Sequence, residues 1–223
     1  QRVPPRAAYY PGAGERHAAF LEAHPEAQLY GSANGGELPW TLIADLDPKA
    51  DEEICFTTEA FCSLFAETGL AAESVVEFFE RAVELCNERL WGTLNATILV
   101  HPRTLEDPEV AAAFERMIAE LRYGTVAINL WAAIGYGLVI PPWGAYPGHD
   151  LYDIQSGTGV VHNTLMFSKV EKTVVRAPFR LFPKPIWFPS HKTTLEIGRR
   201  LTDFEAEPSM LKVPSIVWAA LRG

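Results

Sequence analysis

The sequence predicts an α/β fold in which helices cover both faces of a mostly parallel sheet, giving three layers. Two observations lead to this prediction. Strand-like and helix-like segments alternate with short links between residues 38 and 129. The two clearest helical segments each carry a single apolar stripe, as a helix packed on a sheet requires. Right-handed crossovers between parallel strands are the simplest connections for such a series.

The expected strands are short apolar runs bounded by turn residues. The first 36 residues are rich in Pro, Gly and Ala and are expected to be an irregular lead-in, with one short helix around Glu15–Ala23. Strands are then predicted, in order, at Leu38–Ala44, Cys62–Glu67, Leu94–Val100, Thr125–Asn129 and Lys172–Val175.

The helices are predicted from apolar spacing and from capping residues. Glu73–Leu90 has apolar residues at helical spacing, with charged residues between them. A second helix is expected to begin at Asp107, an N-cap followed by Pro108 at the first helical position, and to run to Arg122. Gly124 is expected to cap its C-terminus.

The composition of the sequence changes after Asn129. Residues 130–190 are rich in Gly, Pro and aromatic residues, and helical propensity returns near Thr193–Arg200 and Ser215–Leu221. We therefore expect one domain at 1–190 and a helical extension at 191–223.

Composition excludes several classes of protein. The net charge is −9 and no Lys/Arg cluster follows a phosphate-binding pattern, so neither nucleic acid nor an anionic membrane is an expected partner. No apolar run approaches the roughly 18 residues of a membrane span. Three cysteines without CxxC spacing indicate a reducing, cytoplasmic environment, and six scattered histidines predict no metal site.

The sequence starts without Met or an apolar signal core, and we interpret it as a piece of a longer polypeptide.

Six short motifs stand in one order along the chain. They are Glu59-Ala60-Phe61, Asn87–Leu94 (NERLWGTL), Gly124–Asn129 (GTVAIN), Pro142–Ala145 (PWGA), Gln155–Gly159 (QSGTG) and Lys172-Thr173-Val174. Their order and spacing resemble the later half of the aldehyde dehydrogenase catalytic domain, over roughly residues 38 to 176. The resemblance implies a Rossmann-like catalytic-domain fragment.

The resemblance implies a nicotinamide cofactor, NAD or NADP, held in part by Glu59 and Phe61. The carboxylate of Glu59 would accept hydrogen bonds from ribose hydroxyls, and Phe61 would lie against the nicotinamide end. The chain departs from the family pattern immediately afterwards, with Cys62 where the family has Gly and Ser63 where it has Pro. Cys62 precedes an apolar run with no nearby histidine, which favours a buried, inert thiol over a nucleophile.

Substrate-side residues are expected after the strand that Asn129 closes. The resemblance implies that Asn129 supports an active-site loop, although an amide that caps a turn is an equally good interpretation. Trp131, Tyr136 and Trp143 either line a tunnel for an aldehyde substrate or belong to an ordinary core.

The first functional hypothesis is therefore the C-terminal part of an NAD(P)-dependent aldehyde dehydrogenase-like oxidoreductase, which oxidises an aldehyde to an acid. The nucleophilic Cys and the base Glu of that family would come from an upstream segment, so the isolated chain is predicted to be inactive. A degenerate, non-catalytic dehydrogenase lobe that serves assembly or ligand binding is the alternative, and an unrelated small α/β binding domain comes third. The complete protein is expected to bind a small aldehyde and a dinucleotide and is a possible homo-oligomer.

Overall fold

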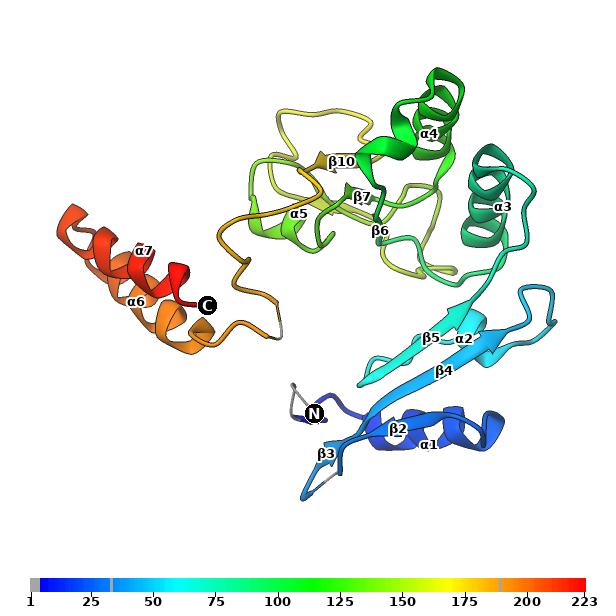
Figure 1. Cartoon of the computed structure of the whole chain (residues 1–223), viewed down its shortest axis with the longest axis horizontal. Coiled ribbons are helices and arrows are strands. Elements are labelled where there is room, and N and C mark those ends of the chain that lie inside the picture. Colours follow the sequence, from blue (N-terminus) through cyan, green and yellow to red (C-terminus); the bar gives the residue numbers. More distant parts are fainter. Residues whose placement is uncertain (1–4, 33, 189) are drawn as a thin grey trace. The chain divides into compact units, whose positions relative to one another are not determined.

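The computed structural model of the chain describes residues 5–32, 34–188 and 190–223 (Figure 1). It divides into two compact units, Pro5–Phe179 and Arg180–Gly223. Within the described ranges, no helix has the length and apolarity that crossing a membrane requires.

The first sheet of the larger unit has three strands. Its central strand is β4 (Trp40–Leu46), which pairs antiparallel with β2 (Gln28–Tyr30) and parallel with β5 (Leu64–Thr68). Helices α1 (Ala13–Ala23) and α2 (Ile54–Thr57) contribute to its core. The buried residues of this core are Phe20, Ile43, Leu46 and Phe56.

A short antiparallel ladder precedes this sheet. It joins β1 (Arg6–Ala7) to β3 (Glu37–Leu38).

The second sheet is entirely parallel, in the order β10-β7-β6. Its strands are β6 (Asn95–Ile98), β7 (Thr125–Ile128) and β10 (Thr173–Arg176). Every residue of the central strand β7 is buried, as expected for a parallel strand covered on both faces.

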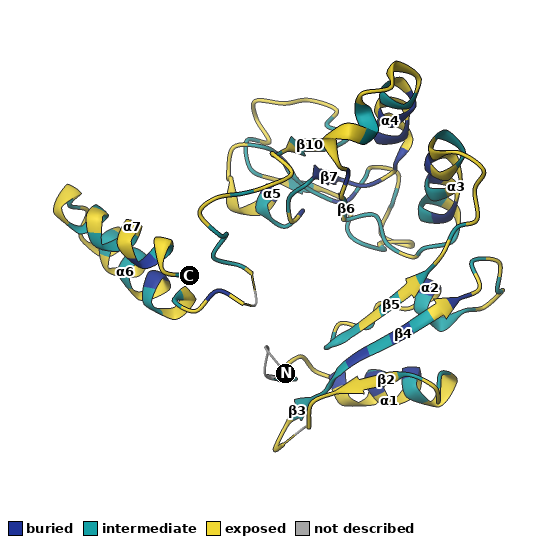
Figure 2. Ribbon diagram, in the orientation of Figure 1, coloured by how far each residue is buried: buried dark blue, intermediate teal, exposed yellow. Residues whose placement is uncertain are grey.

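Two helices provide most of the core next to this sheet. They are α3 (Val75–Glu88) and α4 (Pro108–Glu120), which lie side by side and turn their buried residues inward (Figures 1 and 2). A 3-10 helix, η1 (Pro102–Leu105), leads into α4. The buried cluster consists of Phe79, Val83, Val100, Ala113, Phe114, Met117, Ile118, Leu121, Tyr123, Val126 and Ile128.

The aromatic-rich segment between β7 and β10 contains only small elements among its described residues. They are α5 (Ile134–Gly137) and an antiparallel ladder of β8 (Trp143–Gly144) with β9 (Val160–Val161).

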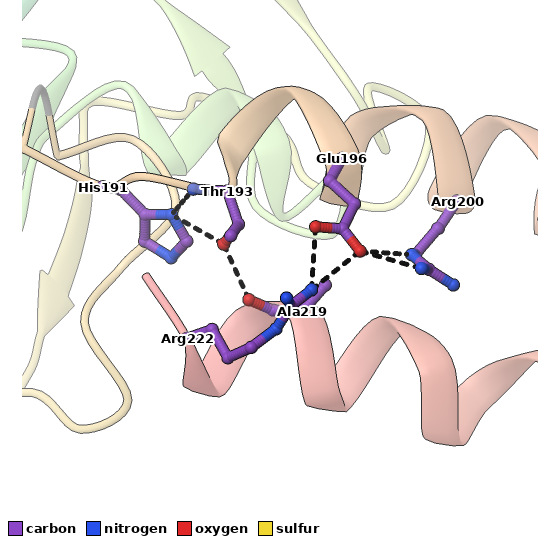
Figure 3. A network of polar contacts seen from close by, with 6 residues as sticks. All are labelled: His191, Thr193, Glu196, Arg200, Ala219 and Arg222. Atoms are coloured by element: carbon purple, nitrogen blue, oxygen red, sulfur yellow. Dashed lines mark hydrogen bonds and ion pairs between the residues drawn. The ribbon is translucent and has the colours of Figure 1, made fainter.

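The smaller unit is a helical hairpin, α6 (Thr194–Ala206) and α7 (Val213–Leu221), with the 3-10 turn η2 (Met210–Lys212) between them. Glu196 on α6 joins the two helices, because its carboxylate binds Arg200 of the same helix and Arg222 just after α7, at 2.8 Å each (Figure 3). Thr193 Oγ1 adds a second link by donating to the Ala219 carbonyl oxygen at 2.7 Å.

The structure confirms an α/β protein with a small parallel sheet and helices. The crossover through α4 joins two neighbouring parallel strands, β6 and β7, as expected. The crossover through α3 differs, because it leads from β5 in one sheet to β6 in the other. The strands expected from the sequence are thus divided between two three-stranded sheets and do not form one.

The predicted role of Gly124 as a helix cap was wrong. Helix α4 ends at Glu120 with Leu121 at the C-cap, and Gly124 does not have a left-handed backbone. A different requirement explains the glycine: a Cβ built on Gly124 would lie 1.8 Å from the Gly144 carbonyl oxygen. The residue permits close backbone packing, not a helix end.

Candidate functional site

Three of the six motifs, and the residue that follows a fourth, meet at the backbone of Thr93. Its carbonyl oxygen accepts hydrogen bonds from the backbone N–H groups of Gly124, at 2.9 Å, and Tyr146, at 3.0 Å. Its own N–H donates to Ser156 Oγ at 2.8 Å. Residues from the NERLWGTL, GTVAIN and QSGTG motifs, and the residue that follows PWGA, therefore gather at one point.

The Lys-Thr-Val motif joins the same cluster through Thr173. Its backbone N–H donates to the Gly124 carbonyl oxygen at 2.8 Å, and its Oγ1 donates to the Pro142 carbonyl oxygen at 2.7 Å. Gly144 packs so closely that an added Cβ would lie 2.2 Å from the Gly159 carbonyl oxygen. The motif glycines and threonine thus have direct packing and hydrogen-bonding reasons for their identity.

Two cavities adjoin the segment Leu90–Gly92, which lines both. The first, here the Arg122 cavity, has a volume of about 470 Å³ and includes Arg89, Arg122 and His149 in its wall. The second, here the Glu59 cavity, has a volume of about 430 Å³. Both volumes are in the usual range for small-molecule sites.

The Glu59 cavity is formed by side chains from distant parts of the larger unit. Its wall includes Glu59, Cys55, Tyr123 and Ser156. Ser156 belongs to the QSGTG motif, so the structure brings the first and the fifth motif of the series to one cavity.

Glu59 lies in the loop between α2 and β5, and its side chain is exposed. The loop itself is fixed, because Arg16 Nε donates to the carbonyl oxygen of Ala60 at 2.9 Å. Among the residues that the structure describes, the Glu59 carboxylate has neither a hydrogen-bond partner nor an ion-pair partner. It is free to accept two hydrogen bonds from a ligand with adjacent hydroxyl groups.

Phe61 does not share this cavity. Its ring is 48% exposed and packs edge-on against Tyr10, with 4.4 Å between ring centroids. It lines a separate cavity of about 330 Å³ together with Trp40 and Cys62. The two residues that the resemblance assigns to cofactor binding, Glu59 and Phe61, therefore line different cavities.

Cys62 is half-buried in the bend before β5. Burial raises the pKa of its thiol above the ordinary value, although the nearby Arg16 guanidinium acts in the opposite direction. Burial likewise raises the pKa of Cys86, and burial with the Glu53 carboxylate raises the pKa of Cys55 to about 12. All three thiols keep their protons at neutral pH, which does not favour a nucleophile.

Asn129 has a left-handed backbone with φ of 58° and stabilises the ends of two neighbouring strands. Its Oδ1 accepts from the backbone N–H of Val100 at 2.9 Å, and its own N–H donates to the Ile98 carbonyl oxygen at 2.8 Å. This contact matches the turn-capping interpretation of the side chain.

The three aromatic candidates do not gather into one wall. Tyr136 and Trp143 are in edge-on contact with 6.0 Å between ring centroids, and Tyr136 also lies 5.1 Å from the ring of His162. Trp131 is 54% exposed. Neither Trp131 nor Trp143 lines any of the three cavities described above.

Two motif residues that the sequence left without a role fix the end of α4. Lys172 Nζ donates to the carbonyl oxygens of Ala119 and Leu121, both at 2.6 Å, and of Ile118 at 3.1 Å. Asn87 Nδ2 donates to the Glu120 carbonyl oxygen at 2.9 Å. A cation and an amide at the negative end of a helix satisfy carbonyl groups that otherwise lack partners.

No protein-family model matches the sequence, and a search among curated proteins finds no match either. The residues around the Glu59 cavity and their geometry are therefore what points to a function.

Proposed function

We propose that the chain is the C-terminal part of an aldehyde dehydrogenase-like, NAD(P)-dependent oxidoreductase, and that Glu59 is its contact to a cofactor ribose. The observation that carries this proposal is the exposed carboxylate of Glu59 on the wall of a cavity of about 430 Å³, without a partner among the described residues. Other exposed glutamates, such as Glu84, also lack a partner among the described residues, and the position of Glu59 on the cavity wall distinguishes it from Glu84. A ribose offers two adjacent hydroxyl groups, which one carboxylate can accept together.

The convergence of the motifs supports the same proposal. Residues of the motif series, far apart in sequence, meet at Thr93 and at the contact between Gly124 and Gly144. A dehydrogenase-like fold accounts for this arrangement, because the motifs flank the neighbouring parallel strands β6, β7 and β10. We keep an unrelated binding domain as the third hypothesis.

The edges of the two three-stranded sheets suggest how they are related. Among the described residues, β5 and β6 each pair with a strand on one side only, and α3 connects them directly. We propose that both three-stranded sheets belong to one mostly parallel sheet, between two layers of helices, in the complete protein. Strands supplied by another segment would complete it.

Aldehyde oxidation in such an enzyme needs a nucleophilic thiolate and a base, and when bound the nicotinamide accepts the hydride. Cys62 does not fit the first role, because burial holds its pKa above the ordinary value. The proposal therefore assigns both groups to a segment outside the 223 residues. The chain's own contribution is a cavity wall and one exposed carboxylate.

A second candidate, a non-catalytic lobe retained for assembly or ligand binding, is favoured by a specific observation. Asn87, Asn129 and Lys172 are all occupied by hydrogen bonds to the backbone. Phe61 packs against Tyr10, in a different cavity from Glu59. A lobe that had lost cofactor binding but kept its fold would show the same backbone hydrogen bonds and the same packing of Phe61.

Cofactor titration of the natural protein that contains these residues separates the two candidates. We expect it to bind NADH or NADPH, and Glu59→Gln to weaken that binding by about 1–3 kcal/mol, as for loss of a charged hydrogen-bond acceptor. Glu84→Gln is the matched control, because Glu84 is an exposed glutamate on α3 that lines none of the three cavities.

The outcomes are distinct. Absence of cofactor binding to the natural protein would favour the non-catalytic lobe. Binding that Glu59→Gln and Glu84→Gln leave equally tight would remove Glu59 from the site while keeping the oxidoreductase proposal.

A further inference from the structure

Three potential metal ligands of different chemistry meet where α1 ends and α2 begins. They are His24, Glu53 and Cys55, and one ligand atom from each lies within 4.8 Å of the other two. His24 and Glu53 are 29 residues apart in sequence, yet Nε2 and Oε1 are separated by only 2.9 Å. Their side chains are 12% and 11% exposed, so the cluster is largely shielded from water.

The backbone holds each of these residues in place. His24 is the C-cap of α1, and its N–H donates to the Phe20 carbonyl oxygen at 2.9 Å. Glu53 is the N-cap of α2, and its Oε1 accepts from the backbone N–H of Cys55 at 2.9 Å. The three ligand atoms are therefore positioned by the ends of two helices and not by a flexible loop.

We infer that His24, Glu53 and Cys55 form a binding site for a zinc-type divalent cation. An imidazole nitrogen, a carboxylate oxygen and a thiolate are the three ligand types that Zn²⁺ takes in proteins. Around a tetrahedral zinc such atoms lie roughly 3.5 Å apart. The ligand atoms, which lie within 4.8 Å of one another, would approach by roughly 1.3 Å at most, while His24 Nε2 and Glu53 Oε1, at 2.9 Å, would move apart by about half an ångström. One thiolate and one carboxylate also balance the charge of the ion, which makes its burial favourable.

A fourth residue supports the assignment. Glu26 Oε1 lies 3.2 Å from the Nδ1 atom of His24, on the opposite side of the ring from Glu53. A histidine that binds a metal through one nitrogen typically donates its other N–H to a carboxylate, which fixes the ring and makes the ligand atom more basic. His24 has this arrangement ready, with Nε2 directed at the cluster and Nδ1 held by Glu26.

An ion has a route to the thiol, because Cys55 lines the Glu59 cavity. Three protein ligands leave one tetrahedral position for water or another small ligand. The thiol is protonated without the ion, so binding must displace that proton. The inference does not depend on the proposed cofactor contact of Glu59, since it uses none of the same side chains.

Cobalt titration of the metal-free protein tests this site. Co²⁺ replaces zinc in such sites and reports its ligands by absorption. We expect saturation at one ion per chain, a charge-transfer band from the thiolate, and loss of that band when Zn²⁺ is added. Cys55→Ser should abolish the band, whereas Cys62→Ser should retain it, because Cys62 lines a different cavity.

Two further measurements keep the test decisive if Cys55→Ser fails to fold. Glu26→Gln changes a side chain that is 69% exposed and should keep the band while weakening affinity by about 10–100-fold. In the unaltered protein and in Cys62→Ser, Zn²⁺ should raise the unfolding temperature, because an ion bound by the folded state alone stabilises that state. Lack of saturable binding, a band that survives in folded Cys55→Ser, or an unfolding temperature unaffected by Zn²⁺ would each show that the cluster is a structural ion pair.

Discussion

His17 shows how one buried side chain links α1 to the first sheet. Its ring is 5% exposed, and its Nε2 lies 2.8 Å from Oγ1 of Thr41 on β4. The Thr41 hydroxyl donates to the Pro39 carbonyl oxygen at 3.3 Å, so its oxygen can accept from the N–H of a neutral His17 ring. Burial lowers the pKa of His17, because a charged ring would have to leave water.

This residue predicts an acid-sensitive contribution to stability. Because the pKa of His17 is lower in the folded state, the contribution is complete above the unfolded value of about 6.5 and is lost as pH falls below it. The difference in unfolding free energy between the wild type and His17→Gln should therefore be larger at pH 7.5 than at pH 5.5. Urea unfolding at the two pH values measures it.

An NMR titration of the histidine rings provides the control for that prediction. Burial also acts to lower the pKa of His24, but the Glu53 and Glu26 carboxylates together raise it. In the metal-free protein, the ring of His17 should thus titrate below the ordinary value and the ring of His24 above it. Equal midpoints for the two rings would contradict this account.

At the scale of the elements, α4 shows which end of a helix can be predicted from its own residues. The Asp107 carboxylate accepts from the Glu109 N–H at 2.8 Å and Pro108 follows it, as the sequence predicted. The other end depends on Lys172 and Asn87, from outside the helix. A glycine near the end of the helix could not reveal these distant partners. For this reason the prediction that Gly124 caps α4 was wrong.

Gly124→Ala should be among the most destabilising single substitutions on this chain. The new methyl carbon would lie 1.8 Å from the Gly144 carbonyl oxygen. The clash is with the backbone, so no side chain can turn away to relieve it. We expect a loss of about 3 kcal/mol or more in unfolding free energy. Chemical denaturation followed by circular dichroism would measure it.

Gly14→Ala is the matched control. Gly14 lies in α1, where an added Cβ has no neighbour within 4 Å outside the backbone of its own helix. This substitution should stabilise the fold by about 0.4–1 kcal/mol, because it restricts the unfolded chain. If both alanines had the same effect, close packing at Gly124 would not be the reason for the glycine.

At the scale of the whole molecule, the chain consists of two units with separate interiors. In the larger unit the interior lies between helices and sheets. The hairpin of α6 and α7 buries little apolar surface among its described residues, Ile197 and Ala219 being its buried apolar positions. Its two helices therefore depend more on the polar contacts of Glu196 with Arg200 and Arg222.

Glu196→Gln should loosen this hairpin without affecting the larger unit. The neutral amide cannot form charge-assisted hydrogen bonds with two guanidinium groups. Hydrogen exchange should then become faster at the backbone amides of α6 and α7 while β7 remains protected. Glu205→Gln, at an exposed position of the same helix, should leave exchange unchanged, and equal acceleration in both variants would contradict the role of Glu196.

The sequence by itself determined the elements whose information is local. Helices α3 and α4 and strands β4, β5, β6, β7 and β10 lie where apolar spacing, caps and turn residues predicted them, with boundaries shifted by a few residues. Helices α1, α6 and α7 lie where helical segments were expected, although α6 runs to Ala206, six residues beyond the expected Arg200. Strands of two or three residues, such as β1, β3, β8 and β9, escaped prediction. They exist only because a distant partner completes their hydrogen bonds.

Tertiary structure decided the rest, because contacts between distant residues leave no local pattern. It divided the strands between two sheets, and it placed Glu59 and Phe61 at separate cavities although they are two residues apart. It also brought His24 to Glu53 and Cys55, a cluster that the spacing of the histidines along the sequence does not indicate. Sequence fixes which side chains can do chemistry, but only the path of the backbone decides which of them meet.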